Sequence, residues 1–159
     1  SSFATIPGAF AGAFTPAIGW LAGGRNVFEP GIFGIIFFLF IWQVPHFWLI
    51  FLTHRKDYEK SGLPVLTMIF TEEQVIRITF IWVLATAVTC LLLPLFLVNF
   101  YIVNFSLFFL TLWLTVNAFK MLLGQKKEIL FACINIYAFL VISLIFLDKL
   151  SLILYNRVF

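Results

Sequence analysis

An amide and an imidazole lie together inside a long apolar stretch of this sequence. Gln43 and His46 stand on either side of Pro45, which has no backbone N–H to donate and so favours a kink in a helix. Each polar group is costly inside a membrane unless it faces a cavity or a partner, so an isolated His46 there indicates a functional site. The alternative is a core histidine whose hydrogen bonds are satisfied within the protein.

A charged segment follows this stretch, over residues 54–64. The carboxylate of Asp57 can hold a hard divalent cation, and Arg55, Lys56 and Lys60 can bind phosphate oxygens. This combination suits a diphosphate group bound with Mg²⁺, although a solvated loop at a membrane surface has a similar composition.

In a helix, Gln43, His46, Ile50, Thr53 and Asp57 fall on one stripe about 60° wide, because each residue turns the helix by about 100°. His46 and Asp57 would then lie about 16 Å apart along the axis, at about 1.5 Å per residue. We therefore expect a wall with His46 deep within it and Asp57 at its charged mouth.

The elements that carry these residues must be membrane helices. Hydrophobic residues make up 63% of the 159 positions and charged residues only 11%, whereas soluble domains have about 25% charged residues. The apolar runs are continuous, without the alternation of a membrane barrel. The sequence predicts an all-α, polytopic transmembrane helical bundle with lipid-soluble partners. No charged run indicates a nucleic-acid partner, and Cys90 and Cys133 lie in apolar runs, as expected for core packing.

Charged and turn-forming residues divide the chain into five expected spans. Residues 78–119 carry no charge, which is about twice the length that one span needs, so we expect a tight turn near Asn99. Thr71 and Gln74 have the spacing of a capping box that opens a helix, and Asp148 is expected to follow the last span. The expected spans are residues 4–22, 31–53, 75–98, 101–122 and 129–147, and residues 54–74 form the charged loop.

Lys and Arg are distributed unevenly among the expected loops. Seven lie in the loops after the second and fourth spans, against Arg25 alone in the loop after the first. Because Lys and Arg concentrate on the cytoplasmic side, we expect these two loops to face the cytoplasm of a bacterial inner membrane, or the matrix of a mitochondrion.

Small and polar residues within the spans are expected to serve packing. Gly8 and Gly12 have the GxxxG spacing that lets two helices approach closely, and Pro16 is expected to bend the first helix. We expect Asn117 and Asn135 to form hydrogen bonds within their own helix or to a neighbouring helix.

Three motifs, taken together, resemble those of a known family. They are AGAFTPAIGW at residues 11–20, PHFW at residues 45–48, and KDY at residues 56–58 followed by GLPVL at residues 62–66. In this order they are similar to the protohaem IX farnesyltransferase (haem O synthase) branch of the UbiA-type intramembrane prenyltransferases. Thr15 and Val44 stand where that branch commonly has a second proline.

The resemblance implies a nine-helix bundle, of which this chain would form the last five helices without the N-terminal half. It also implies transfer of a farnesyl group from farnesyl diphosphate to a vinyl group of haem B, giving haem O. By the resemblance, Mg²⁺ links the diphosphate to Asp57, and His46 lies near the porphyrin as an iron ligand or proton acceptor. The implied catalytic residues are His46, Asp57 and Lys56, and the implied substrate-binding residues are Gln43, Trp48, Arg55, Tyr58 and Lys60.

The sequence departs from the family in lacking the first Asp-rich segment, of the form NDxxDxxxD. Its only Asp residues are Asp57 and Asp148. We therefore predict that the chain by itself has no transferase activity. Two alternatives stay open, a related prenyltransferase that acts on a quinone precursor and a non-catalytic membrane fragment.

Overall fold

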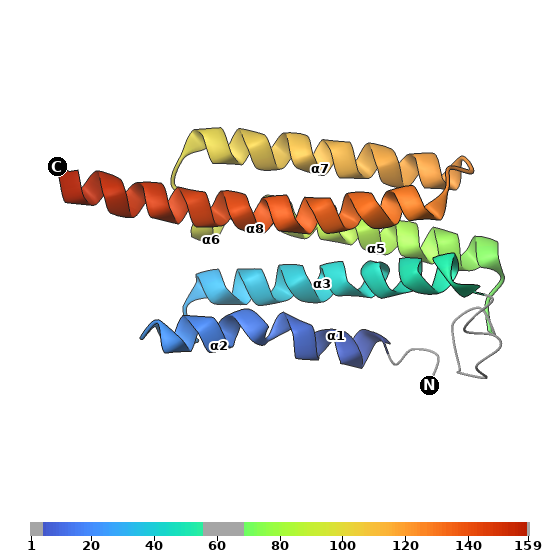
Figure 1. Cartoon of the computed structure of the whole chain (residues 1–159), viewed down its shortest axis with the longest axis horizontal. Helices are drawn as coiled ribbons and strands as arrows, with labels where there is room; N and C mark the ends of the chain where they lie inside the picture. Colours follow the sequence, from blue (N-terminus) through green and yellow to red (C-terminus); the bar gives the residue numbers. More distant parts are fainter. Residues whose placement is uncertain (1–4, 56–68, 159) are drawn as a thin grey trace.

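The computed structural model describes residues 5–55 and 69–158, and within them every regular element is a helix (Figure 1). This confirms the all-α fold class. The helices are α1 (Thr5–Ala13), α2 (Thr15–Ala22), α3 (Pro30–Thr53), α5 (Glu72–Leu92), α6 (Pro94–Leu97), α7 (Tyr101–Leu122) and α8 (Lys127–Val158).

Four long helices form the body of the molecule. α3 packs against α5 and α8, and α7 packs against the same two helices, which closes a ring of four. α1 and α2 lie along the outer side of α3 (Figure 1). In the part of the chain that the structure describes, the helices long and apolar enough to cross a membrane are Pro30–Thr53, Glu72–Leu97, Tyr101–Leu122 and Lys127–Asn156.

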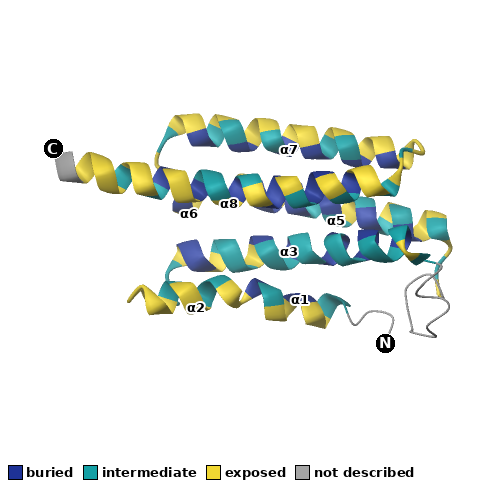
Figure 2. Ribbon diagram, viewed as in Figure 1, coloured by how far each residue is buried: buried dark blue, intermediate teal, exposed yellow. Residues whose placement is uncertain are grey.

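Exposed residues line the outer faces of the described helices (Figure 2), and many of them are large and apolar. Large side chains on the outer faces of the long helices are exposed, for example Phe105 on α7, Ile81 on α5 and Phe139 on α8. A water-soluble protein rarely exposes apolar surface on this scale. The outer faces are therefore suited to contact with lipid acyl chains, as the composition predicts.

The first expected span, residues 4–22, is broken into two short helices. Pro16 lies in the first turn of α2, where its missing N–H leaves the carbonyl of Gly12 without the usual helical donor. The break falls at Phe14, whose N–H donates to the carbonyl of Phe10 at 3.1 Å. The bend is confirmed, but α1 and α2 have only nine and eight residues, against the roughly 20 that one span needs. Within the described residues, four helices are thus long and apolar enough to span a membrane, and a fifth span stays a prediction.

The third and fourth spans agree closely with expectation. Thr71 caps α5 in a capping box with Gln74, whose backbone N–H donates to the Thr71 hydroxyl at 3.3 Å. The cap starts α5 at Glu72, three residues before the expected position. α6 extends the same span to Leu97, a turn follows, and α7 covers the expected residues 101–122. Cys90 and Cys133 are free and buried, as predicted.

The expectation that the last span ends at residue 147 is wrong, because α8 continues to Val158. Asp148 does not mark a helix end; its exposed fraction is only 1%. It extends the buried stripe of α8, three residues beyond Ile145 and seven beyond Val141. Its carboxylate accepts hydrogen bonds from the backbone N–H and the side-chain amide of Asn99, and from the backbone N–H of Phe100.

This contact, which we call the Asp148 cluster, ties α8 to the turn before α7. The donor–acceptor distances are 3.0 and 3.1 Å from the Asn99 N–H to the two carboxylate oxygens, 2.7 Å from Asn99 Nδ2 and 3.0 Å from the Phe100 N–H. The negative charge also lies near the N-terminus of α7, where a helix dipole favours an anion. The buried carboxylate is therefore fully used in holding two helices together.

Candidate substrate site on the face of α3 and α8

His46 lies in α3, and its side chain meets α8. Its Nδ1 is 2.8 Å from Oδ1 of Asn135, a residue 89 positions away in the sequence. The Asn135 side-chain amide nitrogen also donates to the carbonyl of Phe131 at 2.7 Å, within its own helix. The expectation for Asn135 is therefore confirmed, but it missed that the same amide reaches the candidate catalytic histidine.

Aromatic rings surround the imidazole of His46. Its centroid is 4.9 Å from the Trp42 ring and 5.4 Å from the rings of Phe47 and Phe131. The Trp42 indole N–H donates to the carbonyl of Ile134 at 2.9 Å, which fixes α3 against α8 at the same level. These contacts hold the imidazole in a defined orientation, half-buried at the junction of the two helices.

A stripe of α3 side chains leads from His46 to an apolar hollow between α2, α3 and α8. Ile35, Leu39, Trp42 and His46 share one helix face at spacings of four, three and four residues. Ile35 and Leu39 line a cavity of about 290 Å³ together with Ile142 of α8, which lies two turns along α8 from Asn135. His46 and this hollow therefore lie on one continuous wall of the bundle, formed by two facing stripes.

Gln43 meets a different neighbour from His46. A Cβ added at Gly12 of α1 would lie only 2.4 Å from Oε1 of Gln43, so the glycine makes room for the amide. A Cβ at Gly8 would meet nothing within 4 Å. Of the GxxxG pair, only Gly12 thus provides the expected close approach. Gln43 lies toward α1 and His46 toward α8.

Trp48 is part of the packed core, with 1% of its surface exposed. Its indole N–H donates to the hydroxyl of Thr5 at 2.9 Å, and its ring meets Trp82 edge to face at 5.9 Å between centroids. Both its polar atom and its ring are therefore occupied by protein. The prediction that Trp48 contacts a substrate has no support in this geometry.

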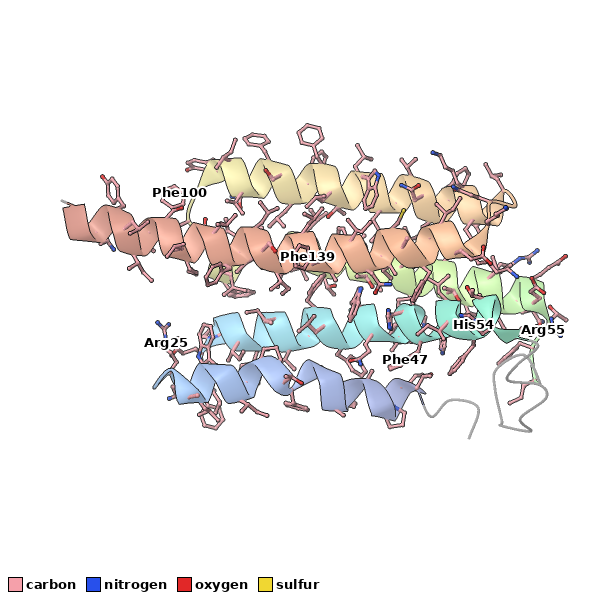
Figure 3. The ribbon with its side chains drawn as sticks, in the orientation of Figure 1. Arg25, Phe47, His54, Arg55, Phe100 and Phe139 are labelled. Atoms are coloured by element: carbon pink, nitrogen blue, oxygen red, sulfur yellow. The ribbon has the colours of Figure 1, made fainter. Side chains whose placement is uncertain are left out.

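Three helices meet at the charged end of the site. His54 and Arg55 lie at one end of the bundle, opposite to Arg25 and Phe100 (Figure 3). Arg55 donates to Glu72 at the start of α5 at 3.2 Å, and Lys127 at the start of α8 pairs with the same carboxylate. Glu72, in the first turn of α5, thus joins two cations.

The remaining predicted residues, Lys56, Asp57, Tyr58 and Lys60, lie outside the described residues. The Mg²⁺ site expected at Asp57 is therefore not described. Within residues 5–55 and 69–158, no group of three or more His, Cys, Asp and Glu side chains could hold a metal ion. Of the predicted site residues, the structure positions Gln43, His46, Trp48 and Arg55, and it adds Asn135.

Two features of the site carried no local sequence signal. The partner of His46 comes from a helix 89 residues further on, so no short motif contains both. The hollow beside Leu39 likewise cannot be predicted from a local pattern, because its position depends on the register between α3 and α8. For Asp148 a signal did exist, since its spacing from Ile145 and Val141 is that of a buried helix stripe.

Comparison with known proteins finds relatives along most of the chain. A protein named protoheme IX farnesyltransferase from Parvibaculum lavamentivorans is 34% identical over 154 residues, covering 91% of this chain and 48% of the relative. Proteins of the same name from Gloeobacter violaceus and Nitratidesulfovibrio vulgaris (strain DP4) are 36% and 38% identical, covering 77% and 60% of this chain.

The chain spans less than half the length of these relatives, since it covers 41% of the Gloeobacter protein and 33% of the Nitratidesulfovibrio protein. No solved structure is significantly similar to it. The model of the UbiA prenyltransferase family matches residues 1–142, and the chain therefore belongs to this family of prenyltransferases.

Proposed function

We propose that this chain is the C-terminal part of an enzyme that transfers a farnesyl group from farnesyl diphosphate to a vinyl group of haem B, giving haem O. The observation that carries the proposal is the similarity over 91% of the chain to a protein named protoheme IX farnesyltransferase. The N-terminal half of the same protein would supply the first Asp-rich segment and complete a nine-helix bundle.

The geometry around His46 supports a role in binding the porphyrin. The imidazole lies about 12 Å below the start of α8, judged from the eight residues between Lys127 and Asn135 at about 1.5 Å per residue. Its Nδ1 is engaged by Asn135, and no described residue forms a hydrogen bond with its Nε2. This nitrogen is suited to act as an iron ligand or proton acceptor. The adjoining wall of Leu39 and Ile142 suits the apolar parts of either substrate.

We place the diphosphate at the charged end, where α3 ends at Thr53, four residues before Asp57 in the sequence. In this proposal Asp57 binds Mg²⁺, which neutralises charge on the leaving diphosphate when it is bound. Arg55, Lys56 and Lys60 assist, and Tyr58 donates a hydrogen bond or stacks beside the prenyl chain. The position of Arg55 supports this arrangement, because it lies at the charged end with Lys127, which pairs with the same Glu72 carboxylate.

We also propose that this charged end faces the cytoplasm of a bacterial inner membrane, with the mitochondrial matrix as the alternative. The positions of Arg55 and Lys127 support this orientation. Seven of the ten Lys and Arg residues lie in the loops after α3 and α7 or in the helix ends beside them, and the ion pairs on Glu72 bring these two loops together. Addition of a reporter to each loop, followed by labelling from one side of the membrane, tests it.

The test of the function uses the full-length protein with the substitution His46→Ala. We expect haem binding and haem O formation to fall by at least tenfold while farnesyl diphosphate binding is unchanged. Haem O is measured by reversed-phase chromatography and haem binding by absorbance. The control is Asn117→Ala, which removes another polar side chain within a span that bonds only its own helix, to the Trp113 carbonyl at 2.8 Å. Unchanged haem turnover in His46→Ala would remove His46 from the mechanism.

Two further results would contradict parts of the proposal. Prenylation of a quinone precursor, with no conversion of haem B, would assign the full-length protein to the related class of prenyltransferase. Haem O formation by the isolated 159-residue chain would contradict the prediction that one Asp-rich segment is insufficient.

A further inference from the structure

We infer that Asn135 is a positioning residue, which holds His46 in the tautomer with its proton on Nδ1 and leaves a lone pair on Nε2. The inference about the tautomer stands on the hydrogen bonds alone. Only the identity of the group that meets Nε2 rests on the proposed function.

The hydrogen-bond partners of Asn135 determine which end of its amide faces His46. An amide has one end that only donates and one that only accepts, and the two are distinguished by their hydrogen-bond partners. Here one end lies 2.7 Å from the carbonyl of Phe131, which can only accept. That end must therefore be the NH₂ group, and the carbonyl oxygen of Asn135 must be the end that faces His46.

The orientation of the amide determines which imidazole nitrogen of His46 carries the proton. Because Oδ1 of Asn135 can only accept, the Nδ1 atom of His46 at 2.8 Å must be the donor. A neutral imidazole has a single N–H, so Nε2 then has a free lone pair. The aromatic contacts with Trp42 and Phe131 oppose rotation of the ring that would exchange the two nitrogens.

The consequence is a sharper role for His46. In its neutral form it is a Lewis base at Nε2, able to bind a metal centre or accept a proton, and unable to donate a proton from that atom. A hydrogen bond from the other ring nitrogen also sets the orientation of a histidine that binds a metal. Asn135 would have this function toward the iron of a porphyrin.

The tautomer is tested by nitrogen NMR of the 159-residue chain in detergent micelles. The chain has only two histidines, so the substitution His54→Gln leaves His46 as the sole histidine signal. After ¹⁵N labelling of histidine, we expect Nδ1 to resonate as a protonated nitrogen and Nε2 as an unprotonated one. A predominantly protonated Nε2 in the neutral imidazole would overturn the inference, whatever the variants show.

Variants of Asn135 test whether this residue causes the preference. Asn135→Leu removes the acceptor, and we expect the proton to move predominantly to Nε2, the form that neutral imidazole prefers in water. Asn135→Gln keeps an amide, with both its acceptor and its donor, and should preserve the proton on Nδ1. The matched control is Asn117→Leu on α7, which should leave the His46 signals unchanged. Retention of the proton on Nδ1 in Asn135→Leu would assign the preference to another group and overturn the role of Asn135.

A second readout separates this inference from the proposed function. In the full-length protein, we expect Asn135→Leu to weaken haem binding by about 10- to 100-fold, the usual effect of losing a partner of a metal-binding histidine, and Asn135→Gln to restore it. If the NMR result holds but the unmodified protein does not bind haem, the proposed function fails and the positioning role stands. Haem binding that is equal in the unmodified protein and in Asn135→Leu would overturn the positioning role toward haem.

Discussion

Among the polar contacts that join α8 to the rest of the bundle, the Asp148 cluster and the His46–Asn135 contact differ in how completely their atoms are used. In the Asp148 cluster, three N–H donors converge on a carboxylate with an exposed fraction of 1%. At the other contact, His46 and Asn135 share one hydrogen bond, and Nε2 of a half-buried imidazole has no hydrogen-bond partner among the described residues.

This difference separates structure from function. A buried charge is tolerated only when its hydrogen bonds are satisfied, and the Asp148 cluster satisfies them within the protein. Nothing is left there for a ligand to bind. His46 is held by one nitrogen and offers the other, which is the arrangement of a binding group. An ionisable residue in a membrane helix is thus a candidate binding group only when the protein does not satisfy all of its hydrogen bonds.

The largest predicted effect concerns stability at the Asp148 cluster. Asp148→Ala would remove the acceptor of the N–H groups of Asn99 and Phe100, which form part-buried hydrogen bonds with α8. We expect a loss of about 3 kcal/mol in the free energy of unfolding, since hydrogen bonds to a charged group contribute about 1.5–3 kcal/mol each. The measurement is reversible unfolding in mixed micelles with increasing SDS, followed by circular dichroism.

The matched comparison is His46→Leu, which replaces the imidazole between α3 and α8 by an apolar side chain of similar size. We expect a loss of about 1 kcal/mol or less, because a single hydrogen bond between membrane helices contributes about 0.6 kcal/mol on average. An equal loss of stability in both variants would break the distinction between a structural contact and a binding site.

The next prediction concerns Gln43, which lies beside His46 along α3 but packs against α1. Gly12→Leu would force a side chain into the space of the Gln43 amide, and overpacking of this kind costs about 1–3 kcal/mol. Gly8→Leu is the control on the same helix, because a Cβ there meets nothing within 4 Å. The same unfolding measurement applies, and equal stability of the two variants would show that the α1–α3 contact is loose.

The sequence predicted the helix ends well where charged or turn-forming residues mark them. α7 begins and ends within the expected residues 101–122, and α3 begins one residue before its expected start. The same rule failed at Asp148, because a charge was taken as a helix end when three donors from another segment satisfy it. Local patterns identify a charge, but they do not show whether it has a buried partner.

The candidate site was predictable only in part. PHFW identified His46 as unusual, since its type and setting are both visible in the sequence. Its partner Asn135 depends on the register between two helices far apart in the chain, and many registers satisfy the same apolar pattern. Trp48 lies in the same motif but on the face of α3 that packs into the core, so its predicted contact with a substrate stays a prediction without support from its position.

The smallest predicted effect concerns a second carboxylate at the same end as the Asp148 cluster. Glu29 lies in the loop between α2 and α3, where Arg25 Nε donates to it at 3.0 Å. This hydrogen bond holds the pKa of Glu29 below its ordinary value of 4.5. A lowered pKa in the folded state favours folding above the ordinary pKa, and the contribution is lost as the pH falls through the folded-state value.

Because the Arg25–Glu29 pair is exposed to solvent, we expect Arg25→Ala to leave the unfolding transition unchanged at neutral pH. The same substitution should move the NMR titration midpoint of Glu29 upward, toward 4.5. A loss of stability comparable to that of Asp148→Ala would mean that hydrogen bonding, without burial, is enough to make a carboxylate structural in this protein. The contrast between the two ends of α8 would then need another explanation, since it assumes that burial decides how much each contact stabilises the fold.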